Sequence, residues 1–407
     1  MKSRRGFGRD RVIGLLKATS GTGGARWFRR SAASSCALAL LAASAPMPAG
    51  QIWTVTGPVR SEQAGLTLMH EHVISDISLP LEQPDRWRLA GRQIPRNDAE
   101  MKAWNSKVGL RNLGEIVHSP IDSRDNLRLT SEAAAIEELK RFKDAGGHTI
   151  VDLTVDDIKR DPAALRRISK ASGVNIVMGT GFYRPAFRSS NVSGATAEAL
   201  AGTMITDIRS GVGTEKVRAG IIGEIGAVND EDGPLSAETV NIVKAAGLAS
   251  KATGAAISLH DIGRYRSRGK AVDILLEQGV SPERIVLGHA TTAAHDEAYL
   301  RSQLERGIYV QFDFLGWPGS YRSAATDDRH TAGLIVRLVR AGFVRQLLLS
   351  HDVCRKTQLA AYGGNGYTYI SRVFVPRLME AGMTRQEIDQ ILINNPRAVL
   401  TFTKAAG

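Results

Sequence analysis

Cysteine is scarce in this chain, and its scarcity excludes a fold stabilised by disulfides. Only Cys36 and Cys354 occur in 407 residues, and Cys36 lies in an N-terminal segment that we expect to be a leader. With one cysteine left in the mature chain, no intrachain disulfide can form, so stability must come from an apolar core. Apolar residues make up 43% of the chain, which is enough for such a core.

Long apolar runs and a basic surface pattern are also missing. The apolar stretch at residues 32–43 is too short and too rich in alanine for a stable membrane span. The formal net charge is +12, but residues 1–50 hold nine Lys or Arg against one Asp, a net of +8, which leaves +4 for the rest. No basic stripe alternates with aromatic residues, so we expect no nucleic-acid partner.

The first 50 residues contain the parts of an export signal. Basic residues precede the apolar stretch, and small residues follow it at 43–45, which is typical of a secretory signal and its cleavage site. Residues 3–7, SRRGF, also resemble a twin-arginine signal, although the residues after them are not apolar. We therefore expect residues 1–50 to be an export signal or disordered leader, and the mature protein to be periplasmic or secreted by either route. A disordered extension from a misplaced start is the alternative.

From about residue 51 onward, short apolar runs alternate with amphipathic segments typical of helices. The apolar runs predict eight strands, at 66–70, 149–154, 174–179, 217–222, 255–259, 284–287, 308–312 and 346–350. Helices are predicted between them, at 132–143, from 161, and at 195–209, 236–250, 270–277, 294–305 and 331–341. Three more, at 369–378, 384–392 and 396–402, form a C-terminal helical tail.

Near-continuous apolar strands are typical of a parallel sheet that is covered on both faces. Eight such units predict an α/β fold, a (β/α)8 TIM barrel, with a long insert at 78–131 after the first strand. A doubly wound open sheet is the alternative, but it would need a glycine-rich phosphate loop after its first strand, and none follows His72. We expect residues 51–407 to form this single domain.

Two histidines end the first predicted strand. Side chains alternate along a strand, so His70 and His72 point to one face and Glu71 to the other. Neutral imidazoles are common metal ligands, but one such pair arises easily by chance. Partners must come from the ends of the other strands, where a barrel places its active site.

Those strand ends supply six side chains that could bind a metal: His70, His72, Glu224, His260, His289 and Asp352. Each alone has an ordinary explanation, such as a buried histidine, an ion pair or a helix cap. Together, in barrel register, they predict a metal site. Six ligands exceed the needs of one catalytic zinc, so we expect two divalent ions that share a carboxylate and hold a bridging hydroxide.

Several segments resemble the phosphotriesterase family of the amidohydrolase superfamily, nearer its lactonases and Glu-bridged homology proteins than true phosphotriesterases. The resemblance spans about 53–403 and is carried by the motifs at 65–72, 179–183, 220–226, 287–289, 350–352 and 395–397. It implies that His70, His72 and Asp352 hold the more buried ion, and that His260 and His289 hold the other. Glu224 stands where many members carry a bridging carboxylated lysine.

The resemblance also implies catalytic roles for two residues. Asp352 accepts a proton from the hydroxide, and Tyr183 lies over the ions as in lactonases. Zinc is the expected metal, with manganese, cobalt and iron as alternatives. Family members often form homodimers, so a homodimer is an open expectation here.

Two residues depart from the phosphotriesterase pattern. Thr292 stands where phosphotriesterases have an acid. Phe314 stands where phosphotriesterases have a histidine and lactonases an arginine, so the resemblance carries over to the metal site better than to the pocket. We therefore predict a binuclear hydrolase that acts on a small molecule with an ester-type bond, with a lactone as the leading candidate. A phosphotriester hydrolase is one alternative. A metal-loaded binding protein without turnover is another, although Asp352, a proton acceptor, argues against it.

Overall fold

Eight parallel strands form the barrel that the alternating pattern predicts. The computed structural model describes residues 50–189, 192–227, 234–260, 266–317 and 327–403, so the expected leader lies outside it except for Gly50. The strands pair in chain order and are β3 (Leu66–Glu71), β6 (Gly147–Asp152), β7 (Asn175–Thr180), β8 (Ile221–Gly226), β9 (Ile257–His260), β10 (Ile285–Leu287), β11 (Tyr309–Phe312) and β12 (Leu347–Leu349). All seven neighbouring pairs are parallel.

The first and last strands meet at what we call the β3–β12 seam. The backbone N–H of His70 donates to Ser350 Oγ at 2.9 Å, and the N–H of Asp352 donates to the carbonyl of His70 at 3.1 Å. The buried Glu71 carboxylate accepts hydrogen bonds from Ser350 Oγ and from the N–H groups of His351 and Val353, all at 2.8–2.9 Å. Glu71 thus uses the face of β3 opposite His70 and His72 to close the barrel.

Helices cover the outside of the sheet. They are α4 (Glu132–Asp144), α5 (Pro162–Ser172), α6 (Ala197–Arg209), α7 (Ala237–Thr253), α8 (Arg266–Glu277), α9 (Glu297–Leu304) and α10 (Asp328–Arg340). Side chains of Ser131, Asp161, Thr196 and Ser236 accept hydrogen bonds from the first turns of α4, α5, α6 and α7, which satisfies backbone donors that lack a helical partner. The large core lies between these helices and the strands.

The insert after the first strand contains three short helices, α1 (Pro84–Leu89), α2 (Asp98–Trp104) and α3 (Leu113–His118). Its two ends are joined by an antiparallel pair of short strands, β4 (Ser75–Asp76) and β5 (Arg128–Leu129). The rings of Trp87 and Trp104 lie 4.9 Å apart in a separate apolar cluster that also includes Tyr183 and Cys354. This cluster ties the insert to loops that follow barrel strands.

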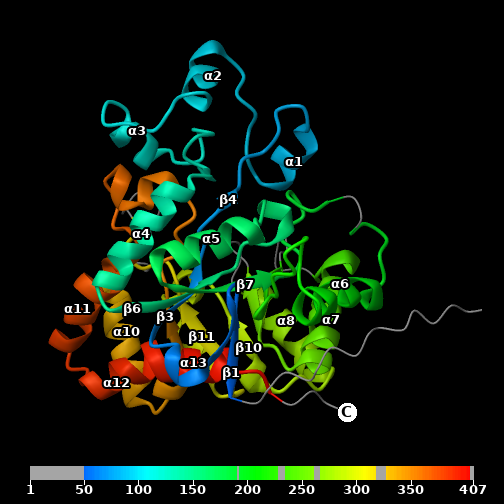
Figure 1. The fold of residues 1–407 in the computed structure, drawn as a ribbon, viewed down its shortest axis with the longest axis vertical. Helices are drawn as coiled ribbons and strands as arrows, with labels where there is room; N and C mark the ends of the chain where they lie inside the picture. Colours follow the sequence, from blue (N-terminus) through cyan, green and yellow to red (C-terminus); the bar gives the residue numbers. More distant parts are fainter. Residues whose placement is uncertain (1–49, 190–191, 228–233, 261–265, 318–326, 404–407) are drawn as a thin grey trace, which may run out of the picture. The chain divides into compact units, whose positions relative to one another are not determined.

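The opposite end of the barrel is closed by the N-terminal hairpin and the tail. Strands β1 (Gln51–Thr54) and β2 (Gly57–Arg60) pair, and Ile52 joins Val177, Leu348 and Leu400 in one apolar cluster. The tail comprises η11 (Ile370–Phe374), α11 (Val375–Glu380), α12 (Arg385–Asp389), η12 (Gln390–Asn394) and α13 (Asn395–Leu400). In Figure 1, β1, α12 and α13 lie at the lower end of the view, whereas α1, α2 and α3 lie at the upper end.

Short helical turns connect the larger elements: η1 (Ser61–Gln63), η2 (Asp156–Ile158), η3 (Pro282–Arg284), η4 (Ala290–Ala293), η7 (Val344–Gln346), η8 (Lys356–Gln358), η9 (Ala360–Tyr362) and η10 (Gly366–Thr368).

The largest error in the predicted bounds concerns the fourth barrel strand, which runs from 221 to 226 rather than 217 to 222. Val217 instead forms an isolated bridge with Val212. Among the described residues, no helix is long and apolar enough to cross a membrane.

Candidate metal centre

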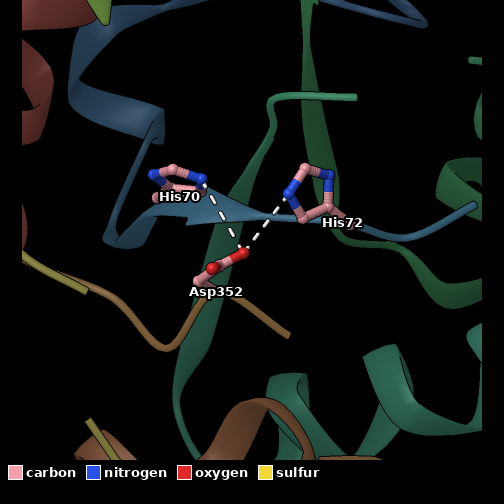
Figure 2. A group of neighbouring side chains, drawn as sticks. All are labelled: His70, His72 and Asp352. Atoms are coloured by element: carbon pink, nitrogen blue, oxygen red, sulfur yellow. Dashed lines mark ion pairs between the residues drawn. The ribbon is translucent and has the colours of Figure 1, made fainter. Parts of the chain in front are cut away.

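Three of the predicted ligands meet across the β3–β12 seam. His70 is on β3, His72 follows it, and Asp352 follows β12, and Figure 2 shows both imidazoles turned toward the carboxylate. Asp352 Oδ1 lies 3.3 Å from His72 Nε2 and 3.8 Å from His70 Nε2. All three side chains are buried, and their ligand atoms are close enough to hold one metal ion. The alternation along β3 is therefore as predicted.

Glu224 reaches into this group from β8. Its Oε1 lies 2.7 Å from His70 Nε2 and 3.5 Å from His72 Nε2, whereas its Oε2 lies 3.8 Å from His260 Nε2. One carboxylate therefore faces histidines from both sides of the barrel mouth.

His289 and His260 complete the set. Ligand atoms of His70, Glu224 and His289 form a second group that could hold a metal ion. The ring centroids of His289 and His260 are 4.5 Å apart, and His260 stands slightly outside both three-residue groups. All six side chains chosen from the sequence thus lie in one buried cluster.

Residues behind the cluster fix the orientation of its imidazoles. Asp313, which follows β11, places Oδ1 3.0 Å from His289 Nδ1 and Oδ2 3.0 Å from His70 Nδ1. Thr154 Oγ1 lies 2.8 Å from His72 Nδ1. A metal-binding histidine typically uses its second nitrogen in this way, which leaves Nε2 for the ion. The sequence placed Asp313 at a strand end but left its role open between pocket lining and an ion pair.

The buried carboxylates of the cluster favour positive charge on His70 and His72. Burial opposes protonation of His70, but Glu224 and Asp313 outweigh it and raise its pKa well above the ordinary value. Burial likewise opposes protonation of His72, yet Asp352 and Glu224 raise its pKa to about 10. Burial would raise the pKa of Glu224, but the facing histidines hold it well below its usual range. The site therefore favours positive charge, which protons or metal cations can supply.

The donor set fits divalent cations. Imidazole nitrogens and carboxylate oxygens suit zinc and similar ions. Among the described residues, Glu224 Oε2 and His289 Nε2 are buried without a hydrogen-bond partner, which is unfavourable unless another ligand binds them. His289 and Asp352 also adopt left-handed backbone angles, with φ of 52° and 53°. Non-glycine residues in this region are uncommon and are concentrated at functional sites.

A cavity of about 330 Å³ opens beside the cluster. Its lining residues are His72, Ile77, Arg92, Ile121, Tyr183, Arg184, Phe187, His260, Thr292, Phe314, Trp317, Asp352, Cys354 and Arg355. Tyr183 places its hydroxyl 3.1 Å from His260 Nε2, and burial raises its pKa well above the ordinary value, so the phenol stays protonated. Phe314 stacks on His289 with ring centroids 4.5 Å apart. The cavity is large enough for a small-molecule substrate.

A parallel barrel with a histidine and carboxylate cluster at its strand ends is the architecture of a metal-dependent hydrolase. The chain belongs to the Phosphotriesterase family, which matches residues 50–400. The resemblance drawn from the motifs is therefore confirmed.

Relatives of known name cover most of the chain. It is 30% identical over 359 residues to N-acetyltaurine hydrolase of Xenopus tropicalis, a match that spans 87% of this chain and 98% of that protein. The N-acetyltaurine hydrolase of Dictyostelium discoideum is also 30% identical, over 369 residues, and the match spans 87% of this chain and 99% of that protein.

Solved structures show the same fold. A resiniferatoxin-binding protein from Rhodobacter sphaeroides is 31% identical, with 86% of this chain and 95% of that chain covered and a TM-score of 0.78. A lactonase from Listeria monocytogenes is 22% identical, with 87% of this chain and 100% of that chain covered and a TM-score of 0.66. At this identity the similarity supports the fold alone.

Proposed function

We propose that this protein is a two-metal hydrolase that cleaves an ester-type bond of a small molecule, with a lactone as the first candidate. The observation that carries the proposal is the position of Glu224, whose two oxygens face His70 at 2.7 Å and His260 at 3.8 Å. A carboxylate between two sets of imidazoles is suited to bridging two adjacent cations.

The chain's own residues divide into two ligand sets. His70, His72 and Asp352 would hold the first ion, and His260 and His289 the second, with Glu224 between them. Zinc is the expected metal, with manganese, cobalt and iron as alternatives. When bound, two such ions would supply a nucleophilic hydroxide and polarise the carbonyl oxygen of the substrate.

Two residues would handle the proton and the substrate. Asp352 lies at the edge of the cluster and lines the cavity, so it can accept the proton of the attacking group and pass it toward solvent. Tyr183 keeps its hydroxyl proton and can donate a hydrogen bond to the substrate oxygen on which charge develops. Phe314 and Trp317, whose rings lie 4.4 Å apart, give the cavity an apolar wall that excludes water.

An amide substrate is the second candidate. N-acetyltaurine hydrolases are 30% identical over nearly their whole length, and their name describes cleavage of an N-acetyl bond. A carbonyl substrate is favoured over a phosphotriester because Thr292 and Phe314 line the cavity where phosphotriesterases have titratable side chains. One relative is named a resiniferatoxin-binding protein, so the third hypothesis, a metal-loaded binding protein without turnover, is included among the outcomes of the test.

The test combines elemental analysis with a substrate panel. Protein loaded with zinc or manganese would be assayed against γ- and δ-lactones, aryl esters, N-acetyl amides and diethyl 4-nitrophenyl phosphate. We expect about two metal ions per chain and hydrolysis of a lactone or ester. Turnover of the amides alone would favour the second candidate. Two bound ions with no turnover of any class would overturn the hydrolase and favour a binding protein.

The cell location and the assembly state are further proposals. We propose that residues 1–50 direct export and that the mature chain pairs as a homodimer. Fractionation of cells and light scattering of the purified protein would test these two points.

A further inference from the structure

Three arginines line the same cavity as the metal-binding residues. Arg92 comes from the insert, Arg184 from the loop after β7, and Arg355 from the segment after β12. Among the described lining residues, Asp352 is the only carboxylate, and it belongs to the metal cluster. The lining of the cavity is therefore rich in positive charge.

Aromatic rings and a backbone carbonyl contact two of these guanidinium groups. Arg92 donates a hydrogen bond to the Ile77 carbonyl at 3.2 Å and lies 5.9 Å from the centre of the Phe187 ring. Arg355 lies 4.8 Å above the Trp317 ring. In the part of the chain that the structure describes, no carboxylate lies within ion-pair distance of Arg92 or Arg184.

The three charges act on one another. Burial, followed by the charges of Arg355 and Arg184, lowers the pKa of Arg92 to about 10. The Nε of Arg184 is buried and has no hydrogen-bond partner among the described residues. Neighbouring cations in a buried wall repel one another in the free protein, and an anion bound between them would relieve that repulsion.

We propose that Arg92, Arg184 and Arg355 form an anion subsite, and that the substrate is an acyl compound that carries a carboxylate or sulfonate. The proposal rests on the proposed hydrolase and narrows its substrate class. The guanidinium fork pairs with two oxygens of such a group, which would anchor the substrate in the cavity that His260 and Asp352 also line. A neutral lactone or ester would leave Arg92 and Arg184 without an anion to neutralise them.

Binding of ethanesulfonate to the metal-loaded full chain tests the subsite directly. A sulfonate is a weak metal ligand, so its affinity reports on the arginines rather than on the ions. We expect calorimetry to give saturable binding that weakens with salt, and a dissociation constant that rises about tenfold or more in Arg92→Gln and Arg184→Gln. The matched control is Arg141→Gln, an exposed arginine on α4.

Arg184→Gln is the more informative of the two variants. The Nε of Arg184 makes no hydrogen bond to a described residue, so the substitution removes the charge without breaking a hydrogen bond of that atom. Equal ethanesulfonate affinity in the wild type and in folded Arg184→Gln would overturn the subsite. Absence of ethanesulfonate binding to the wild type would do the same.

Kinetics separate the subsite from the hydrolase. Mono-4-nitrophenyl succinate and 4-nitrophenyl butyrate are esters of similar size, of which only the first carries a carboxylate. We expect a higher kcat/KM for the succinate, and a ratio between the two that falls about tenfold in either arginine variant. Equal cleavage of both esters would reject the subsite and keep the hydrolase. Arginine-dependent ethanesulfonate binding without cleavage of either ester would reject the hydrolase and keep the subsite.

Discussion

Asp313 offers a sharp test of the metal centre, because it orients ligands without being assigned as one. The substitution Asp313→Asn keeps the size of the side chain and removes one negative charge. The native carboxylate lies 3.0 Å from Nδ1 of both His289 and His70 and accepts a hydrogen bond from Gln311 Nε2 at 2.8 Å. It also accepts the backbone N–H of His289 at 2.9 Å.

The amide introduced by Asp313→Asn would not serve both imidazoles. The amide oxygen can accept from one Nδ1–H, whereas the NH2 group would donate to the other Nδ1 and place the proton on Nε2, the atom that an ion needs. Loss of such an orienting partner typically weakens metal affinity 10- to 100-fold, or about 1.4–2.7 kcal/mol. Because Asp313 is hydrogen-bonded to His289 and also lies within ion-pair distance of His70, we expect a change near the upper end of this range.

The assay is a zinc competition titration against a chromogenic chelator, with circular dichroism to establish that Asp313→Asn is folded. Asp144→Asn, which alters an exposed carboxylate at the end of α4, is the control and should bind zinc like the wild type. If folded Asp313→Asn binds zinc within twofold of the wild type while His289→Ala does not, the orienting role of Asp313 is refuted.

Four further predictions concern the site and the N-terminal segment. Glu224→Ala should lower the metal content below two ions per chain in elemental analysis, and unchanged content would contradict the bridge. Tyr183→Phe should lower kcat about a hundredfold at unchanged metal content, and equal kcat would remove its role as a donor. In metal-free protein the pKa of His72 is raised from 6.5 to about 10, so its stabilising protonation is complete below pH 6.5 and lost as the pH rises toward 10. Denaturant unfolding of metal-free protein should show that loss, and zinc affinity should rise over the same range because zinc displaces the proton. Removal of residues 1–49 should leave the melting temperature unchanged, because we propose that they belong to an export signal that the mature protein lacks.

The sequence predicted the fold well because each strand is a short apolar run between helical patterns. The bounds of β3 differ from the prediction by one residue at one end, and those of β7 by one residue at each end. The error at β8 falls where glycines interrupt the apolar sequence: the strand contains Gly223 and Gly226, and glycine is more typical of turns than of strand interiors. In a barrel, glycines within a strand permit close approach of neighbours, and Gly223 lies against Ser258 on the adjacent strand.

The six metal-binding candidates were also predictable, because each stands at or near a strand end. The role of Asp313 was not, since its contact with His70 crosses β12, which lies between β11 and β3 in the sheet. Arg92 was missed for another reason. It lies in an insert without periodicity, and only the folded chain brings it beside Arg184 and Arg355.

The β3–β12 seam has a consequence for how the protein matures. The contacts between Glu71 and Val353 join residues 282 positions apart, and the same junction brings Asp352 to His70 and His72. A nascent chain that has not yet emerged past Asp352 lacks one of the three donors of the group formed by His70, His72 and Asp352. In the proposed two-metal site, that group is complete only after nearly the whole polypeptide has been translated, so products that end before residue 352 should hold fewer ions than the full chain.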